Sequence, residues 1–179
     1  MKQPQTKAEL LAGLGASRAE LESIVTQVPS ERMTEPGACG TWSIKDVLAH
    51  LAVGNDWLAL QLERRARGEV PDPEELQRVA ELGLADNERR NTYYAQQHKD
   101  LDLAYVQDWD RRANERLLTA LAELPESRLQ EPDWWTYGRA LGSVFDLNHD
   151  REHAQDIQRW LGQHLIVTPS EGEGESKPA

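Results

Sequence analysis

The sequence predicts an all-α protein: a four-helix bundle with a long crossover excursion between its second and third bundle helices. Four long segments place apolar residues at helical spacing. No segment shows the sustained apolar–polar alternation that is typical of a half-buried strand, and nothing repeats at a fixed period. With 179 residues, 39% of them hydrophobic, the chain is long enough for a single core. We therefore expect one domain over residues 1–165, followed by a disordered acidic tail over 166–179.

The first helix is expected to start after Thr6. Thr6 and Glu9 form the pattern of a capping box, in which each side chain accepts a hydrogen bond from the other residue's backbone N–H. An apolar stripe follows on one face, made of Leu10, Leu14, Leu21, Ile24 and Val28. This spacing predicts an amphipathic helix that packs against the core.

The second helix is expected to start after Ser43, with Asp46 at the third helical position. It should run to about Arg67 and stop at Gly68, since glycine is the preferred residue just past a helix end. Its inner face consists of Ile44, Val47, Leu48, Leu51, Asn55, Leu58 and Leu62.

Residues 69–98 are more polar and begin with two prolines, so we interpret them as the excursion, with one or two less regular helices. The third bundle helix should begin with Asp100 as its cap and end before Pro125. The last helix should run from about Tyr137 to Leu161. Its apolar stripe consists of Leu141, Val144, Phe145, Ile157, Trp160 and Leu161.

His149 and His153 are four positions apart in the last predicted helix, on the same stripe as its apolar residues. A buried imidazole needs a partner for each ring nitrogen, and a shared cation would provide one. His50, at the border of the second helix's apolar stripe, is the third candidate ligand. Three histidines and one open position are typical of a catalytic divalent metal ion. The alternative for each histidine alone is a polar residue bonded to a carbonyl or carboxylate.

Other residues near these histidines are candidates for supporting roles. Glu152 is a candidate general base, with an exposed helix-face acid as the alternative. Asp46 and Asp146 are candidate acceptors that would orient the histidine rings. Cys39 has no basic or histidine partner in the sequence, which favours an ordinary loop residue over a nucleophile.

The space between the second and last helices is a candidate pocket. We expect its walls to come from Trp57, Asn55 and Phe145, which would contact a substrate or thiol cofactor. The alternative is that these residues belong to the core or the rim.

The net charge of −11, from 31 acidic and 20 basic residues, argues against a nucleic acid or an anionic membrane surface as partner. No apolar stretch approaches the ~20 residues of a membrane span. The single cysteine and the absence of an apolar run in "MKQPQTKAEL" favour a cytoplasmic location.

The segments "GTWSIKDVLAHL" and "YGRALGSVFDLNHDREHAQDIQRWL" together resemble the DinB/YfiT-like superfamily, and within it the ClbS/DfsB group. The resemblance covers nearly all of residues 5–162. It implies a four-helix bundle with a long crossover, often a homodimer, that binds nickel or zinc through three histidines. Those positions correspond to His50, His149 and His153.

The superfamily's activities imply small-molecule chemistry. They include transfer or isomerisation that uses low-molecular-weight bacterial thiols, and, in the ClbS branch, opening of a reactive cyclopropane in a genotoxin. This chain departs from that toxin-protecting branch, whose closest members can lack the histidine pair. We therefore expect a metal-dependent enzyme that acts on a small electrophilic substrate by hydrolysis or thiol transfer. The alternative is a non-catalytic bundle that binds a small molecule or a metal.

Overall fold

The computed structural model describes residues 6–69, 86–132 and 145–164, together with Glu74, Gln77 and Glu81. Its helical elements are α1 (Lys7–Val25), η1 (Ser30–Arg32), α2 (Ile44–Ala66), α4 (Asn87–His98), α5 (Leu103–Glu123), α6 (Glu126–Leu129) and α7 (His149–His164). Within the described residues, β pairing is limited to an isolated bridge between Cys39 and Trp42. The all-α prediction is confirmed.

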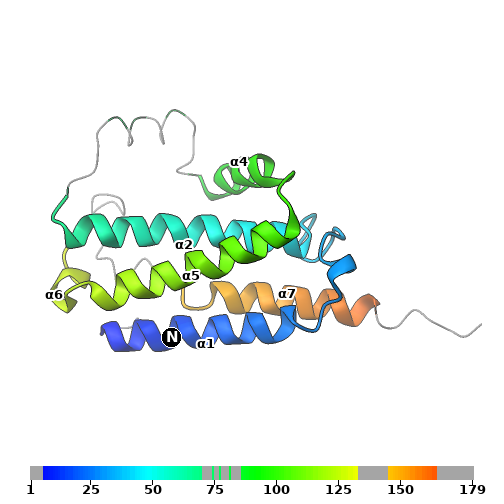
Figure 1. Cartoon of the computed structure of the whole chain (residues 1–179), viewed down its shortest axis with the longest axis horizontal. Helices are drawn as coiled ribbons and strands as arrows, with labels where there is room; N and C mark the ends of the chain where they lie inside the picture. Colours follow the sequence, from blue (N-terminus) through cyan, green and yellow to red (C-terminus); the bar gives the residue numbers. More distant parts are fainter. Residues whose placement is uncertain are drawn as a thin grey trace, which may run out of the picture.

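Four of these helices form a bundle of two pairs, shown in Figure 1. Helix α2 packs chiefly against α5, and α1 against α7, while smaller α1–α5 and α2–α7 contacts join the pairs. Figure 1 also shows that α2 and α5 run in the same direction and that α1 and α7 run opposite to them. Because α2 and α5 are neighbours that run in the same direction, the chain needs a long connection from the end of α2 back to the start of α5. The chain provides it between Ala66 and Leu103, with α4 lying against α2.

The predicted starts of α1 and α2 are confirmed. The Thr6 hydroxyl accepts a hydrogen bond from the Glu9 N–H at 3.2 Å, and the Glu9 carboxylate accepts one from the Thr6 N–H at 3.1 Å. Ser43 and Asp46 repeat this capping box. At the other end of α2, Gly68 has a φ of 73°, a left-handed conformation that costs glycine little and that ends the helix.

Two other predicted helix starts were wrong. Helix α5 is capped by Asp102, not by Asp100: the Asp102 carboxylate accepts a hydrogen bond from the Ala104 N–H at 2.8 Å. The last helix begins at His149, and residues 145–148 before it are not helical. There the Asp146 carboxylate accepts a hydrogen bond from the Asn148 N–H at 3.0 Å, a local bond that competes with the helical ladder.

The predicted part of the last helix over residues 137–144 lies outside the described residues, as does the predicted tail over 166–179. No described helix is long and apolar enough to cross a membrane.

Among the described residues, the core contains two apolar clusters, and the Arg18–Asp110 pair is buried beside them. Val47, Leu51 and Ile157 belong to the cluster that joins α2 to α7. Between α1 and α5, Arg18 donates two hydrogen bonds to the Asp110 carboxylate, at 3.0 and 2.5 Å. Both residues are buried, so Asp110 depends on Arg18 for its compensation, while Arg18 also donates a hydrogen bond to Glu22 at 2.8 Å.

Candidate metal centre

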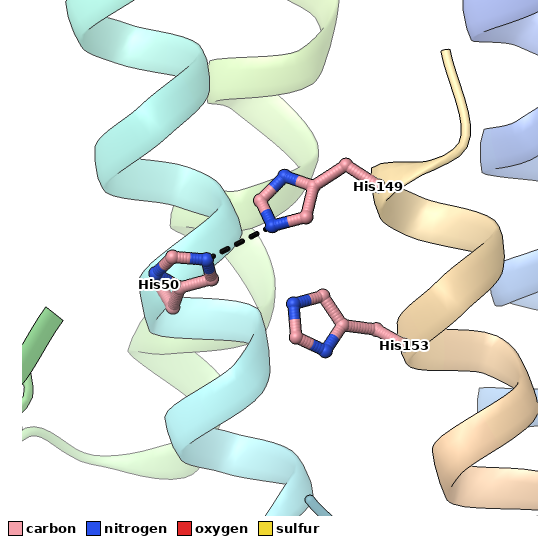
Figure 2. Close-up of side chains that lie close together, drawn as sticks. All are labelled: His50, His149 and His153. Atoms are coloured by element: carbon pink, nitrogen blue, oxygen red, sulfur yellow. Dashed lines mark hydrogen bonds between the residues drawn. The ribbon is translucent and has the colours of Figure 1, made fainter. Parts of the chain in front are cut away.

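The three candidate histidines come from two helices that meet on one side of the bundle. His50 lies in α2, seven residues after its Ser43 cap, and His149 and His153 lie in the first turns of α7. Figure 2 shows the three rings turned toward one another across the space between these helices. The spacing of four residues in α7 places both of its rings on the side that faces α2.

The ring nitrogens are close enough to share an ion. His50 Nε2 lies 3.1 Å from His149 Nε2. The ring centroids are 5.0 Å apart for His50 and His149, 5.5 Å for His50 and His153, and 4.9 Å for His149 and His153. One nitrogen from each residue lies within 4.8 Å of the other two. Small inward movements would bring all three to the roughly 2.0–2.1 Å distance of a histidine ligand from zinc.

His153 is the member of the group whose polar atoms lack a partner. The residue is 9% exposed, and both of its ring nitrogens are buried without a hydrogen bond. Leaving a buried donor or acceptor unpaired costs about 1–3 kcal/mol. A bound cation would remove this cost for one of the two nitrogens by taking its lone pair, so the donor set fits a metal.

Burial keeps two of the rings neutral. It lowers the pKa of His50 to about 3, with further lowering by the neighbouring His149, His153 and Arg90. Burial also lowers the pKa of His153 to about 4; His149 lowers it further, and Asp156 opposes the shift. Both rings therefore offer a free lone pair at neutral pH, the form in which imidazole binds metals.

The other predicted site residues are in varied surroundings. Glu152 is exposed on α7. Trp57 is 40% exposed, whereas Phe145 is 5% exposed and packs in the apolar cluster around Leu10. Asn55 is half-buried, and its side-chain nitrogen is buried without a hydrogen bond. Their roles in catalysis or ligand binding stay predictions.

One carboxylate beside the centre, that of Asp156, is one that sequence reasoning missed. Asp156 Oδ2 lies 4.0 Å from His153 Nδ1 and accepts a hydrogen bond from the Cys39 thiol at 3.2 Å. Asp46 and Asp146, the candidates for this role, instead bond to backbone N–H groups at helix starts. The signal in the sequence that could have identified Asp156 is its spacing of three residues from His153, which places both side chains on one face of α7.

Comparison with known proteins places the chain in a family. Residues 14–157 match the mycothiol maleylpyruvate isomerase N-terminal domain family. The chain belongs to this family. The match includes all three histidines, and it supports the resemblance to the DinB/YfiT-like superfamily that the sequence motifs indicated. Comparison with curated proteins gave no match.

Solved structures share the fold of this family member. An uncharacterised protein from Escherichia coli UTI89 has 20% sequence identity and a TM-score of 0.72, over 92% of this chain and 98% of that one. A protein from Streptococcus pneumoniae has 14% identity and a TM-score of 0.71, over 93% and 95%. The colibactin self-resistance protein ClbS, in complex with a double-stranded DNA, has 14% identity and a TM-score of 0.64, over 93% and 100%.

The ClbS complex corrects one expectation from the sequence. We excluded a nucleic acid as partner because of the net charge of −11. That exclusion was wrong, because a protein with this fold has been solved with double-stranded DNA. Net charge is a sum over the whole surface, whereas a phosphate backbone interacts with the charges on one face only.

Proposed function

We propose that this protein is a metal-dependent enzyme that acts on small electrophilic molecules, either by hydrolysis or by transfer of a low-molecular-weight thiol. The observation that carries the proposal is the convergence of three histidine rings, one of which has both nitrogens buried without a partner. A purely structural cluster would be expected to pair those nitrogens with protein groups.

His50, His149 and His153 would hold the ion, which we propose to be zinc or nickel. A bound divalent ion lowers the pKa of water toward neutrality and ionises a thiol, which makes either one a nucleophile. Three neutral ligands leave the ion's charge intact and favour an anionic fourth partner. His50 and His149 are only half-buried, which supports access from solvent on their side.

The chain's own residues would bind the substrate and move the proton. We propose that Glu152, exposed beside the two histidines of α7, accepts the proton of the attacking nucleophile. Trp57, Asn55 and Phe145 are the proposed contacts for the substrate or thiol. Two names support this chemistry: the family is named for the mycothiol maleylpyruvate isomerase N-terminal domain, and ClbS is a colibactin self-resistance protein.

The test is turnover by protein loaded with zinc or nickel. A panel of epoxides, activated alkenes and strained rings would be assayed with and without small thiols. We expect turnover that requires metal and is lost in His153→Ala. Glu152→Gln should lower kcat while it retains the metal, because an amide cannot accept the proton.

His98→Ala is the control, since His98 lies in α4 against Tyr94 and Trp109. If His153→Ala matched the parent protein on every substrate that either one turned over, the catalytic proposal would fail. A loaded protein that binds these compounds without converting them would instead be a binding protein.

A further inference from the structure

We propose a second cation site, formed by Cys39, His153 and Asp156 and selective for metal ions that prefer sulfur. It goes beyond the proposed function, and it shares His153 with the three-histidine centre. One ligand atom from each of the three residues lies within 4.8 Å of the other two. Thiolate, imidazole and carboxylate together are a ligand set of zinc and of softer ions.

The distances suit a tetrahedral ion. Cys39 Sγ is 3.2 Å from Asp156 Oδ2, which is 4.0 Å from His153 Nδ1. Ligands that lie about 2.0–2.3 Å from a tetrahedral ion are roughly 3.3–3.8 Å from one another. The three atoms therefore need only small movements to coordinate, and the thiol proton would pass to solvent as the sulfur binds.

Both segments that carry these ligands are held in place. Cys39 exchanges two backbone hydrogen bonds with Trp42, at 3.2 and 3.0 Å, in the loop before α2. Asp156 follows His153 by three residues in α7, so the two side chains extend from the same face of the helix. Because both segments are already ordered, binding an ion would cost little further conformational entropy of the backbone.

The orientation of His153 is a second, independent observation. Figure 2 shows one of its ring nitrogens facing His50 and His149, and the other pointing away from them. The nitrogen on the far side, Nδ1, is the atom near Asp156. It is buried and has no hydrogen bond, so the cluster contains an unpaired donor atom where an ion would sit.

Arg159, the positive charge next to the site, leaves one oxygen of the Asp156 carboxylate available to bind an ion. Arg159 forms an ion pair with the other oxygen of Asp156, Oδ1, so that Oδ2 faces the thiol. The Arg159 side chain is 72% exposed, and it can therefore turn into solvent when a cation binds.

Sharing one ring makes the two sites compete. A neutral imidazole has one nitrogen with a free lone pair, while the other carries the proton. An ion on Nδ1 therefore withdraws His153 from the three-histidine centre. A thiophilic metal ion would in this way displace the metal that His50, His149 and His153 hold.

The test uses Cd²⁺ and the metal-free protein. Cd²⁺ bound to a thiolate absorbs in the ultraviolet by charge transfer, and Cys39 is the only cysteine of the chain. We expect this absorption in the parent protein, its loss in Cys39→Ser, and a fall in Cd²⁺ affinity of roughly tenfold or more in Asp156→Asn. Asp108→Asn, which changes an exposed carboxylate on α5, should leave the affinity unchanged.

His50→Gln separates this site from the proposed function. It removes a ligand of the three-histidine centre but none of the Cys39 site, so the thiolate absorption should persist. Absence of the absorption in the parent protein would overturn the proposal. So would an unchanged Cd²⁺ affinity in Asp156→Asn, measured by the thiolate absorption, whatever the outcome of the turnover assays.

Discussion

His50 Nε2 and His149 Nε2 lie 3.1 Å apart, although 99 positions separate the two residues in the chain. One comes from α2 and the other from α7, which belong to different pairs of the bundle. Their approach therefore depends on how the two pairs pack, and a change at either ring should affect metal binding.

Replacing His149 with Gln should lower zinc or nickel affinity by roughly a hundredfold or more, because one of three ligands is lost. Isothermal titration calorimetry measures the change. His98→Ala should bind as the parent does, since that ring lies in α4 and contacts Tyr94 and Trp109. Equal losses in both variants would show that the histidine cluster is not the binding site.

The metal-free protein should lose stability as the pH falls below about 6.5. The pKa values of His50 and His153 are about 3 and about 4 in the folded protein, against an ordinary value of 6.5. Between these values the unfolded chain binds more protons, so the free energy of unfolding falls by up to about 1.4 kcal/mol per pH unit for each ring.

Urea unfolding at a series of pH values measures this slope. The double variant His50→Gln, His153→Gln should show a flatter dependence between pH 6.5 and 4 than the parent. An identical slope in both proteins would mean that neither pKa is depressed in the folded state.

Replacing Asp110 with Ala should lower the free energy of unfolding by about 3 kcal/mol, because the buried Arg18 would lose its two-bond partner and keep only the more exposed Glu22 and Asp150 at 4.0 Å. Asp108→Ala on the same helix is the matched control. Its ion pairs with Arg111 and Arg112 are exposed and screened by solvent, so the cost should be much smaller than that of Asp110→Ala. Comparable losses in denaturant unfolding would contradict the importance of the buried pair.

Removing the cap of α2 by Ser43→Ala should cost about 1 kcal/mol, since the Asp46 N–H loses its acceptor. Ser23→Ala, at an exposed position inside α1, should be neutral or slightly stabilising, because alanine is the better helix former. Thermal or urea unfolding would distinguish the two. A Ser43→Ala protein as stable as the parent would show that the cap contributes little.

The sequence by itself determined the features that depend on near neighbours. The capping boxes at Thr6 and Ser43 and the end of α2 at Gly68 involve residues a few positions apart, so their patterns are visible in the chain. The spacing of His149 and His153 likewise places both rings on one side of a helix. The apolar stripes predicted the bundle, because amphipathic helices must bury one face.

Local competition between short polar side chains was harder to predict. The Asp146 carboxylate accepts a hydrogen bond from the Asn148 N–H where the apolar stripe predicted helix, and residues 145–148 are not helical, so α7 begins only at His149. A similar competition between nearby acceptors applies to α5, which is capped by Asp102 and not by the predicted Asp100. Several acceptors compete within a few residues, and small differences in backbone geometry decide which one bonds.

Only the tertiary structure decided what lies around His153. Cys39 and Asp156 are 117 positions apart, and their contact follows from the docking of the loop before α2 against α7. The sequence indicated that His153 faces inward, but both of its ring nitrogens are buried without a hydrogen bond, which a pattern within one helix does not predict. Helical periodicity predicts the face on which a side chain lies, whereas its partners across the bundle are set by how whole helices pack.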